Sequence, residues 1–263
     1  MATNSVALAC PVHRPKFSLF TRFVESYKNV RPDCDLFFVL GEDERGVLDD
    51  YRRVWDETEY IFAEKIEPNP SVITYKKFVA LDQLAGTGRY RGIAAVDADS
   101  EFVRGGFHDS FNRFKAEMKV CGYPLEHLDR DPFHEVVAET VRYFKASPEL
   151  NEYRQIYAWW NTLPWYVDDH ILPFLASVGF YEHRFVNQSW YAYDQTLYHA
   201  WLASEGQLKF DDRHILLEYP EMMRTADLDN FGAHTLDWVR HSARRMPIFK
   251  GQNPLMHFHT DRE

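Results

Sequence analysis

The chain has 263 residues, of which 45% are hydrophobic and 16% aromatic, and its formal net charge is −10. This length and composition fit one large globular domain with a sizeable core and exclude a disordered or low-complexity chain. The negative charge and the lack of a Lys/Arg-rich block argue against a nucleic-acid partner. No stretch approaches the roughly 20 apolar residues of a transmembrane segment, and we expect no secretory signal.

Three cysteines, Cys10, Cys34 and Cys121, stand at unrelated spacings. An odd number of thiols without regular spacing is typical of reduced cysteines, so we expect a cytoplasmic protein. No Cys/His set has the spacing of a structural zinc site.

The first hundred residues alternate short apolar runs, which predict strands, with amphipathic stretches, which predict helices. This alternation implies an α/β fold with a mostly parallel sheet and right-handed crossovers. In chain order we expect a strand over 6–10 that Pro11 stops, a helix over 15–29, a strand over 36–40, a helix over 47–55, a strand over 60–62, a helix over 75–84 and a strand from 93.

The second half is mixed α+β. We expect helices over 133–145, 168–178, 194–204 and 227–245, and a strand over 185–193. No linker rich in Pro, Gly or Ser divides the chain, so we expect a single domain over 1–263 with a cofactor-type half followed by a mixed half.

The fourth predicted strand ends in two carboxylates, Asp97 and Asp99. If the strand is buried, both emerge at its carboxyl end, where ligands of open α/β sheets bind. Alternation along the strand would put both on one face, ready for a divalent cation. The alternative is a solvated turn. Three further Asp-x-Asp patterns lack a preceding strand: Asp33/Asp35, Asp129/Asp131 and Asp227/Asp229.

The first strand with its proline-initiated helix, the helix 75–81 (YKKFVAL) and the segment 90–99 (YRGIAAVDAD) resemble GT-A-type glycosyltransferases. The resemblance covers residues 5 to 105 closely and the rest loosely. It implies a Rossmann-like sheet flanked by helices, with a nucleotide-sugar-binding half over about 1–105 and an acceptor half over about 106–263. It also implies transfer of a sugar from a nucleoside-diphosphate sugar, most simply UDP-linked, to a carbohydrate acceptor in surface polysaccharide or glycan synthesis.

The resemblance further implies a donor site. The segment after the first strand would cradle the nucleotide base, Asp97 would face the ribose or donor sugar, and Asp99 would bind Mn²⁺ or Mg²⁺. One lysine at the start of the 75–84 helix would reach the donor phosphates as a point charge, and the alternative for Lys76 or Lys77 is solvated surface lysine. The candidate donor-binding residues are Ala9, Cys10, Pro11, His13, Arg14, Lys77, Asp97 and Ala98.

A third metal ligand is expected near the C-terminus, where His257 and His259 stand two residues apart. Many metal-dependent GT-A enzymes return a late histidine to the cation, and His257 is the preferred candidate. Carboxylate oxygens with one imidazole suit Mn²⁺, which would stabilise the charge on a departing diphosphate. The alternative is a polar chain terminus without a ligand.

An aromatic stretch before Asp168 and Asp169 is the predicted acceptor region. Trp160 and Trp165 are candidates for stacking on sugar rings, and Asp169, then Asp168, for the base that an inverting transfer requires. The alternatives are helix capping by the aspartates and burial of the tryptophans in the core.

Other enzyme classes fit less well. A sugar-1-phosphate nucleotidylyltransferase should have a Gly-rich loop after the first strand, but residues 10–15 read CPVHRP. A metal-dependent hydrolase would use Asp97, Asp99, His257 and His259 and bind its cation without a nucleotide. A carbohydrate-binding module is opposed by the helical content. Retention and inversion both remain open.

Overall fold

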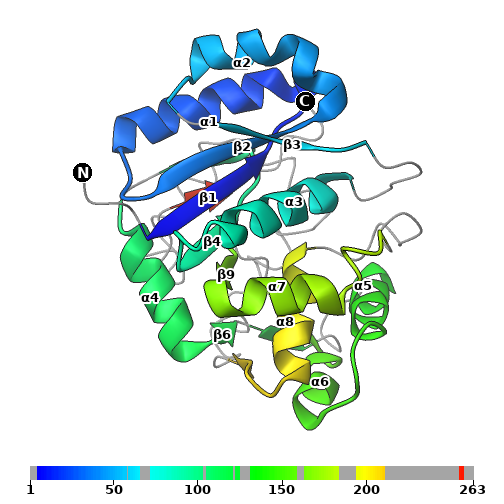
Figure 1. Ribbon diagram of the computed structural model, residues 1–263. Helices are drawn as coiled ribbons and strands as arrows, with labels where there is room; N and C mark the ends of the chain where they lie inside the picture. The colour runs from blue at the N-terminus through cyan, green and yellow to red at the C-terminus, as the bar shows by residue number, and fades with distance from the viewer. Residues whose placement is uncertain are drawn as a thin grey trace.

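The computed structural model describes residues 5–57, 59–65, 72–102, 105–120, 122–124, 131–158, 163–183, 194–210 and 255–257. Its centre is a five-stranded sheet in the order β3-β2-β1-β4-β9 (Figure 1). The strands are β1 (Val6–Pro11), β2 (Asp35–Gly41), β3 (Tyr60–Ala63), β4 (Gly92–Ala95) and β9 (Trp165–Val167). The first four are mutually parallel and β9 is antiparallel to β4, which confirms the predicted α/β class with a mostly parallel sheet.

Helices lie on both sides of this sheet, with α1 and α2 on one side and α3 on the other (Figure 1). The helices of the first half are α1 (Phe17–Val30), α2 (Leu48–Val54), α3 (Val72–Gly86) and α4 (Phe107–Glu117), with short 3₁₀ helices η1 (Arg14–Lys16) and η2 (Glu42–Val47). The second half contributes α5 (Asp131–Val141), α6 (Pro148–Tyr153), α7 (Asp168–Ser177) and α8 (Asp194–Ser204).

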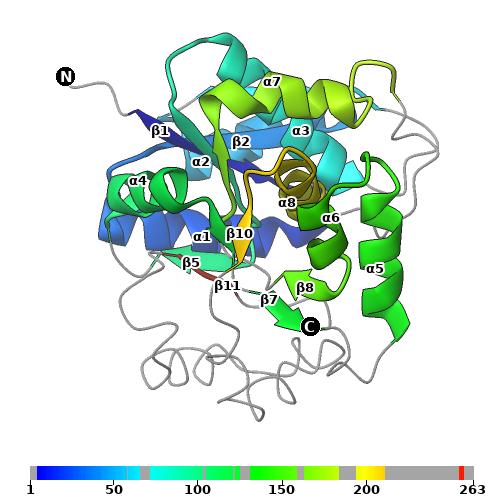
Figure 2. The same cartoon turned by 90° about the horizontal axis from the view of Figure 1, so that it is seen from below.

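Among the described residues, three two-stranded sheets accompany the main sheet. They pair β10 (Lys209–Phe210) with β6 (Lys119–Val120), β11 (Leu255–His257) with β5 (Ser100–Phe102), and β7 (Gly122–Pro124) with β8 (Ile156–Ala158). Figure 2 shows β5 and β11 side by side near α1. The pairing therefore brings the late segment 255–257 to the strand that follows Asp99.

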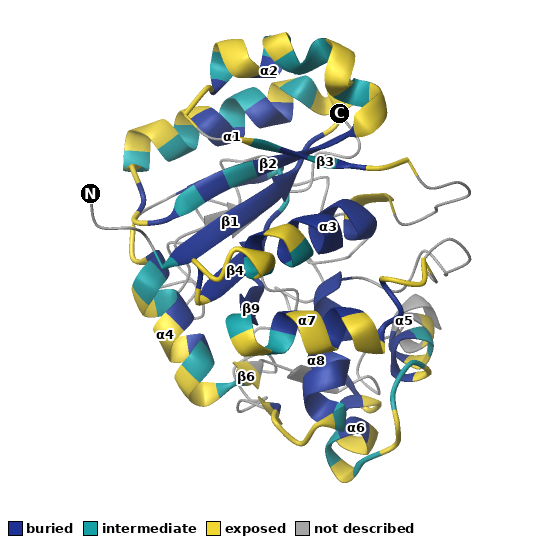
Figure 3. Cartoon of the chain, in the orientation of Figure 1, coloured by how far each residue is buried: buried dark blue, intermediate teal, exposed yellow. Residues whose placement is uncertain are grey.

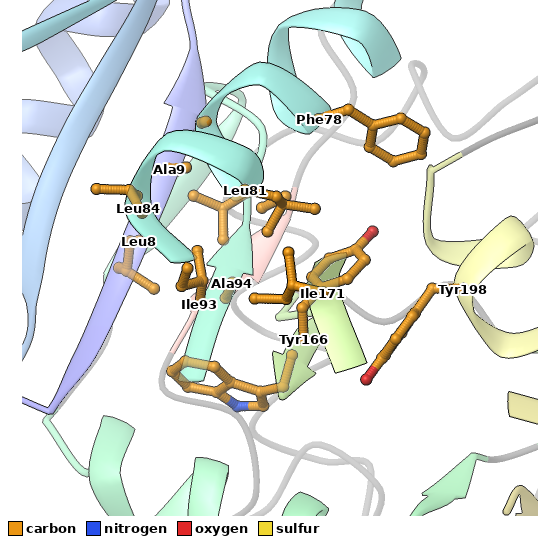
Figure 4. Close-up of a cluster of buried hydrophobic side chains, with 14 of the residues drawn as sticks. Leu8, Ala9, Phe78, Leu81, Leu84, Ile93, Ala94, Tyr166, Ile171 and Tyr198 are labelled. Atoms are coloured by element: carbon orange, nitrogen blue, oxygen red, sulfur yellow. The ribbon is translucent and has the colours of Figure 1, made fainter. Parts of the chain in front are cut away.

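The core forms around β1 and β4, which are apolar and buried along their whole length, as strands covered on both faces must be. On the α1 side, Phe20 and Phe23 pack edge-on against Phe38 of β2. On the α3 side, Phe78 and Leu81 lie among buried residues of β4, α7 and α8 (Figure 4). Helix α8 is buried from residue 194 to residue 203, and α3 over most of its length (Figure 3).

The predicted elements of the first half are confirmed with shifted ends. Strand β1 continues through Pro11 instead of stopping before it, α1 begins at Phe17 after a 3₁₀ turn, and α3 begins three residues early at Val72. In the second half, α5, α7 and α8 are confirmed. The predicted strand over 185–193 and helix over 227–245 lie outside the described residues. Helix α4 and strand β9 were not expected.

Within the described part of the chain, no helix is both long and apolar enough to span a bilayer. Cys10 and Cys34 are buried, free thiols.

The N-terminus of α4 is capped from a distant loop. One oxygen of Asp33 accepts the backbone N–H groups of Gly106 and Phe107 at 3.2 and 3.0 Å, and the other accepts that of His108 at 3.4 Å. Partial burial acts to raise the pKa of Asp33, but these backbone donors outweigh it and lower the pKa below its usual value. The ionised carboxylate therefore stabilises the fold through the helix terminus.

We expect Asp33→Ala to cost about 1 kcal/mol of unfolding free energy at pH 7, in the range of a lost helix cap. Because the folded-state pKa is lowered, the contribution is present above the unfolded pKa of about 4 and is lost as pH falls through the folded value. Urea unfolding at pH 7 and pH 3.5 should show the gap between variant and wild type shrinking. An unchanged gap would contradict the charged cap.

The start of β4 tolerates no side chain, because a Cβ at Gly92 would lie 2.3 Å from two ring atoms of Phe111. Gly92→Ala should therefore cost about 1–3 kcal/mol by overpacking. Gly86→Ala is the matched control, since a Cβ there meets nothing within 4 Å. The urea midpoint should fall for Gly92→Ala and should stay the same or rise for Gly86→Ala. Equal midpoints for the two variants would refute the close approach of Phe111 to Gly92.

Candidate functional site

The order in which successive strands join the sheet changes direction at one point, between β1 and β4. From β1 the chain proceeds to β2 and β3 on one side, then returns to place β4 on the other side of β1. Strands β1 and β4 are parallel to each other, with Ala9 opposite Ala95. The N–H of Val96 donates to the carbonyl of Ala9 at 2.9 Å. Ligands of open α/β sheets bind outside the carboxyl ends of the strands at such a switch point.

Asp97 and Asp99 lie at this switch point. Strand β4 ends at Ala95 and β5 begins at Ser100, so both carboxylates belong to the short connection between the two strands. Strand alternation therefore does not set their relative orientation, and that part of the expectation is wrong. Both residues are partly buried, and Asp99 Oδ1 lies below the surface.

A buried lysine of α3 reaches the same point. Lys77 Nζ lies 2.9 Å from Asp97 Oδ1 and 3.2 Å from Asp194 Oδ1. The Lys77 and Asp194 side chains are only 3% and 4% exposed, whereas that of Asp97 is 26% exposed. The ammonium therefore joins α3, the β4–β5 connection and the first residue of α8, with Asp97 as the carboxylate nearest solvent.

Asp194 is a site residue that the sequence interpretation missed. Lys77 holds its Oδ1, and the hydroxyl of Tyr166 on β9 donates to its Oδ2 at 3.0 Å. The position at the start of α8 also favours a negative charge. In the sequence, Asp194 is an aspartate before a helical stretch, a pattern that ordinary helix caps also have. Only its contact with Lys77 distinguishes Asp194 from such a cap.

The charges in this cluster depend on one another. Burial acts to lower the pKa of Lys77, but Asp194 and Asp97 raise it above its usual value, so the amine stays protonated. Burial raises the pKa of Asp194, and Lys77 opposes that rise. Burial, with a further contribution from Asp97, also raises the pKa of Cys10, which remains a thiol and is no nucleophile here.

The predicted base-binding segment needs correction. Because β1 extends to Pro11, Ala9, Cys10 and Pro11 are buried within the sheet and do not form a loop. The loop after β1 starts at Val12 and leads into η1 at Arg14, and His13 and Arg14 are exposed. The Arg14 guanidinium is paired with Asp50 at 2.8 Å. Ala98 lies between Asp97 and Asp99, partly buried.

The expectation that Lys76 or Lys77 is a solvated surface lysine is wrong, because both are buried. Residues 74–81 of α3 are all buried, so the polar side chains there must find partners inside the protein. Lys76 Nζ donates to the carbonyl of Val12 and to Glu44 Oε2, each at 2.9 Å.

The backbone register places His257 next to the predicted metal ligands. Strand β11 is antiparallel to β5 with His257 opposite Ser100, the residue after Asp99. His259 lies outside the described residues. Within the described ranges, no three His, Cys, Asp or Glu side chains form a group that could hold a metal by themselves.

The structure does not bring the predicted acceptor residues to the switch point. Strand β9 is antiparallel to β4, so Val167 lies opposite Gly92 and the N–H of Asp168 donates to the carbonyl of Arg91. Asp168 and Asp169 therefore stand at the amino end of β4, while Asp97 follows its carboxyl end, and β4 between them spans roughly 10 Å. Asp168 pairs with Lys115 at 3.1 Å, and Asp169 is exposed.

Trp165 is 2% exposed on β9, packs edge-on against Phe111 and donates its indole N–H to Ser110 at 3.0 Å. It is a core residue with no free ring face for a sugar. Trp160 lies outside the described residues.

No protein-family model matches the chain, and no curated protein matches it in sequence. By structure, the chain is similar to mouse xyloside xylosyltransferase 1 in its apo form, with a TM-score of 0.39 and 12% identity over 79% of this chain and 84% of that one. A likeness at this distance carries no functional argument, so the function has to be argued from the geometry of the switch point.

The Lys77 cluster makes a stability prediction. Lys77→Met leaves two carboxylates facing each other in a buried place, and breaking such a pair costs about 3–5 kcal/mol. Without the ammonium, the carboxyl groups should bind protons more tightly in the folded state, so the loss should shrink as pH falls from 7.5 to 5. Urea unfolding at the two pH values measures both effects.

The matched control is Lys115→Met, which removes the partly exposed pair with Asp168 and should cost at most about 1 kcal/mol. Equal losses for the two variants would contradict a buried, shared ammonium at Lys77.

Proposed function

We propose that the chain is a glycosyltransferase that binds a nucleoside-diphosphate sugar, most simply UDP-linked, together with Mn²⁺ or Mg²⁺, at the switch point between β1 and β4. The acceptor is a carbohydrate. The observation that carries the proposal is the position of Asp97 and Asp99 directly after β4, beside the loop that follows β1. This edge of the sheet is where α/β folds bind nucleotide ligands.

The residues at this edge fit a cation shared with the donor. Asp97 and Asp99 offer carboxylate oxygens, and the backbone of His257 is paired with Ser100, the residue after Asp99. A cation such as Mg²⁺ binds one or two carboxylates together with substrate phosphates and does not need an all-protein cage. When bound, the cation stabilises the charge on the departing diphosphate.

The protein's own residues prepare the site. Lys77 and Tyr166 hold both oxygens of Asp194, and Lys77 also holds Asp97. Two carboxylates share one ammonium, so this trio carries a net negative charge that attracts a cation. Because Lys77 is buried, it acts by orienting Asp97, and its ammonium is already committed to carboxylates instead of donor phosphates.

Neither Asp168 nor Asp169 is retained as the base, because both stand at the opposite end of β4. The proposal therefore leaves the stereochemical outcome of the transfer open.

Thermal unfolding with a panel of nucleoside diphosphates, each with and without Mn²⁺, tests the proposal. Ligand binding stabilises by RT ln(1 + [L]/Kd), so at 100 times Kd the midpoint should rise by several degrees. We expect this rise for one base only and only with the cation. Asp99→Asn should abolish it.

The control is Asp109→Asn, an exposed aspartate on α4 that should keep the full shift. A shift produced by Mn²⁺ alone would favour a metal-dependent hydrolase, and a nucleotide shift that survives in both variants would refute the assigned site.

A further inference from the structure

The loop after β1 is held by a largely buried ion pair between Glu44 and Lys76, which belong to two other elements. Glu44, in η2 after β2, accepts the backbone N–H of Arg14 on Oε1 at 2.7 Å, with His13 Nδ1 at 3.4 Å from the same oxygen. Its Oε2 accepts the N–H of Gly41 at 3.0 Å and Lys76 Nζ at 2.9 Å. Lys76 in turn donates to the carbonyl of Val12.

We propose that Glu44 and Lys76 are positioning residues that hold the loop Val12–Arg14 in the shape that receives the nucleotide base. This inference rests on the proposed function and adds residues that touch the loop rather than the donor. The pair grips the loop backbone at both ends: Lys76 at the Val12 carbonyl and Glu44 at the Arg14 amide.

Burial makes this pair rigid. The side chains of Lys76 and Glu44 are 8% and 11% exposed. Burial acts to raise the pKa of Glu44, but the hydrogen bonds from Lys76, Gly41 and Arg14 outweigh it and lower the pKa, so the carboxylate stays ionised. Charge-assisted hydrogen bonds of this kind are short and roughly twice as strong as neutral ones.

The exposed groups of the same loop do not explain its shape. Arg14 turns away toward Asp50 of α2 and stacks over Phe17 at 4.8 Å, and His13 is largely exposed. The segment Val12–Arg14 follows β1, whose Ala9 pairs with Ala95 at the end of β4, and the N–H of Val12 donates to the carbonyl of Val39 in β2 at 3.0 Å. Holding this backbone in advance lowers the ordering cost of binding a ligand there.

The test separates the base from the diphosphate. Calorimetric titration of Glu44→Gln and Lys76→Met with uridine diphosphate plus Mn²⁺ should give affinities at least tenfold weaker than wild type. Titration with inorganic pyrophosphate plus Mn²⁺ should stay within about twofold, because the diphosphate belongs to the Asp97–Asp99 side. The double variant should bind uridine diphosphate no more weakly than whichever single variant binds it more weakly, since both substitutions break the same Glu44–Lys76 ion pair.

Glu42→Gln is the matched control, because it makes the same chemical change in the same 3₁₀ turn but loses only an exposed pair with Arg45. It should leave both affinities unchanged. Should Lys76→Met fail to fold, Lys76→Arg keeps the charge and should retain most of the uridine diphosphate affinity.

Three results overturn the inference. If Glu44→Gln binds uridine diphosphate as tightly as wild type does, the positioning role of Glu44 and Lys76 is refuted and the proposed function is not. Equal losses for both ligands would reveal general damage to the site instead of positioning of the base. If the wild-type protein binds neither ligand with Mn²⁺, the proposed function is refuted, and the positioning role of Glu44 and Lys76 is refuted with it.

Discussion

The buried ammonium of Lys77 is the interaction on which the arrangement of the site depends. It brings a carboxylate from the β4–β5 connection and one from the start of α8 to within 3.2 Å of a single nitrogen. Burial of a charge is costly unless it is paired and hydrogen-bonded. The pairing therefore couples the sheet half of the chain to the helical half at the point where β1 and β4 diverge. Asp97 is the member of this cluster that remains accessible, and a second buried lysine, Lys76, organises the neighbouring loop through Glu44.

Much of the first half could be predicted from the sequence because its strands are buried on both faces and read as short apolar runs. The helices α1 and α3 have apolar residues at helical spacing, and Phe107, Phe111 and Phe114 would have predicted α4 in the same way. Strand β9 has only three residues, Trp165, Tyr166 and Val167. A segment this short and aromatic cannot be distinguished from a binding surface until its pairing with β4 is known.

Only those parts of the site that are close together in the sequence could be predicted. Asp97 and Asp99 follow an apolar run, and that proximity in sequence placed them at the sheet edge. Asp194 and its contact with Lys77 join residues far apart in the chain, so no spacing indicates them. A role for Asp168 or Asp169 as the transfer base requires them near the donor site, and their place at the other end of β4 could not be foreseen because the direction of an edge strand is not encoded in its residues. The burial of Lys76 and Lys77 was missed because α3 lies between the sheet and a second helical layer.

The central claim is that the switch point between β1 and β4 holds a cation and a nucleoside diphosphate together. Anomalous diffraction at the manganese edge, from crystals grown with uridine diphosphate and Mn²⁺, tests it most directly. The account predicts one manganese peak within coordination distance of Asp97 or Asp99, with the diphosphate on the same ion and the base over Val12–Arg14. A nucleotide bound at the Asp168 end of β4, or a manganese peak remote from both aspartates, would contradict it.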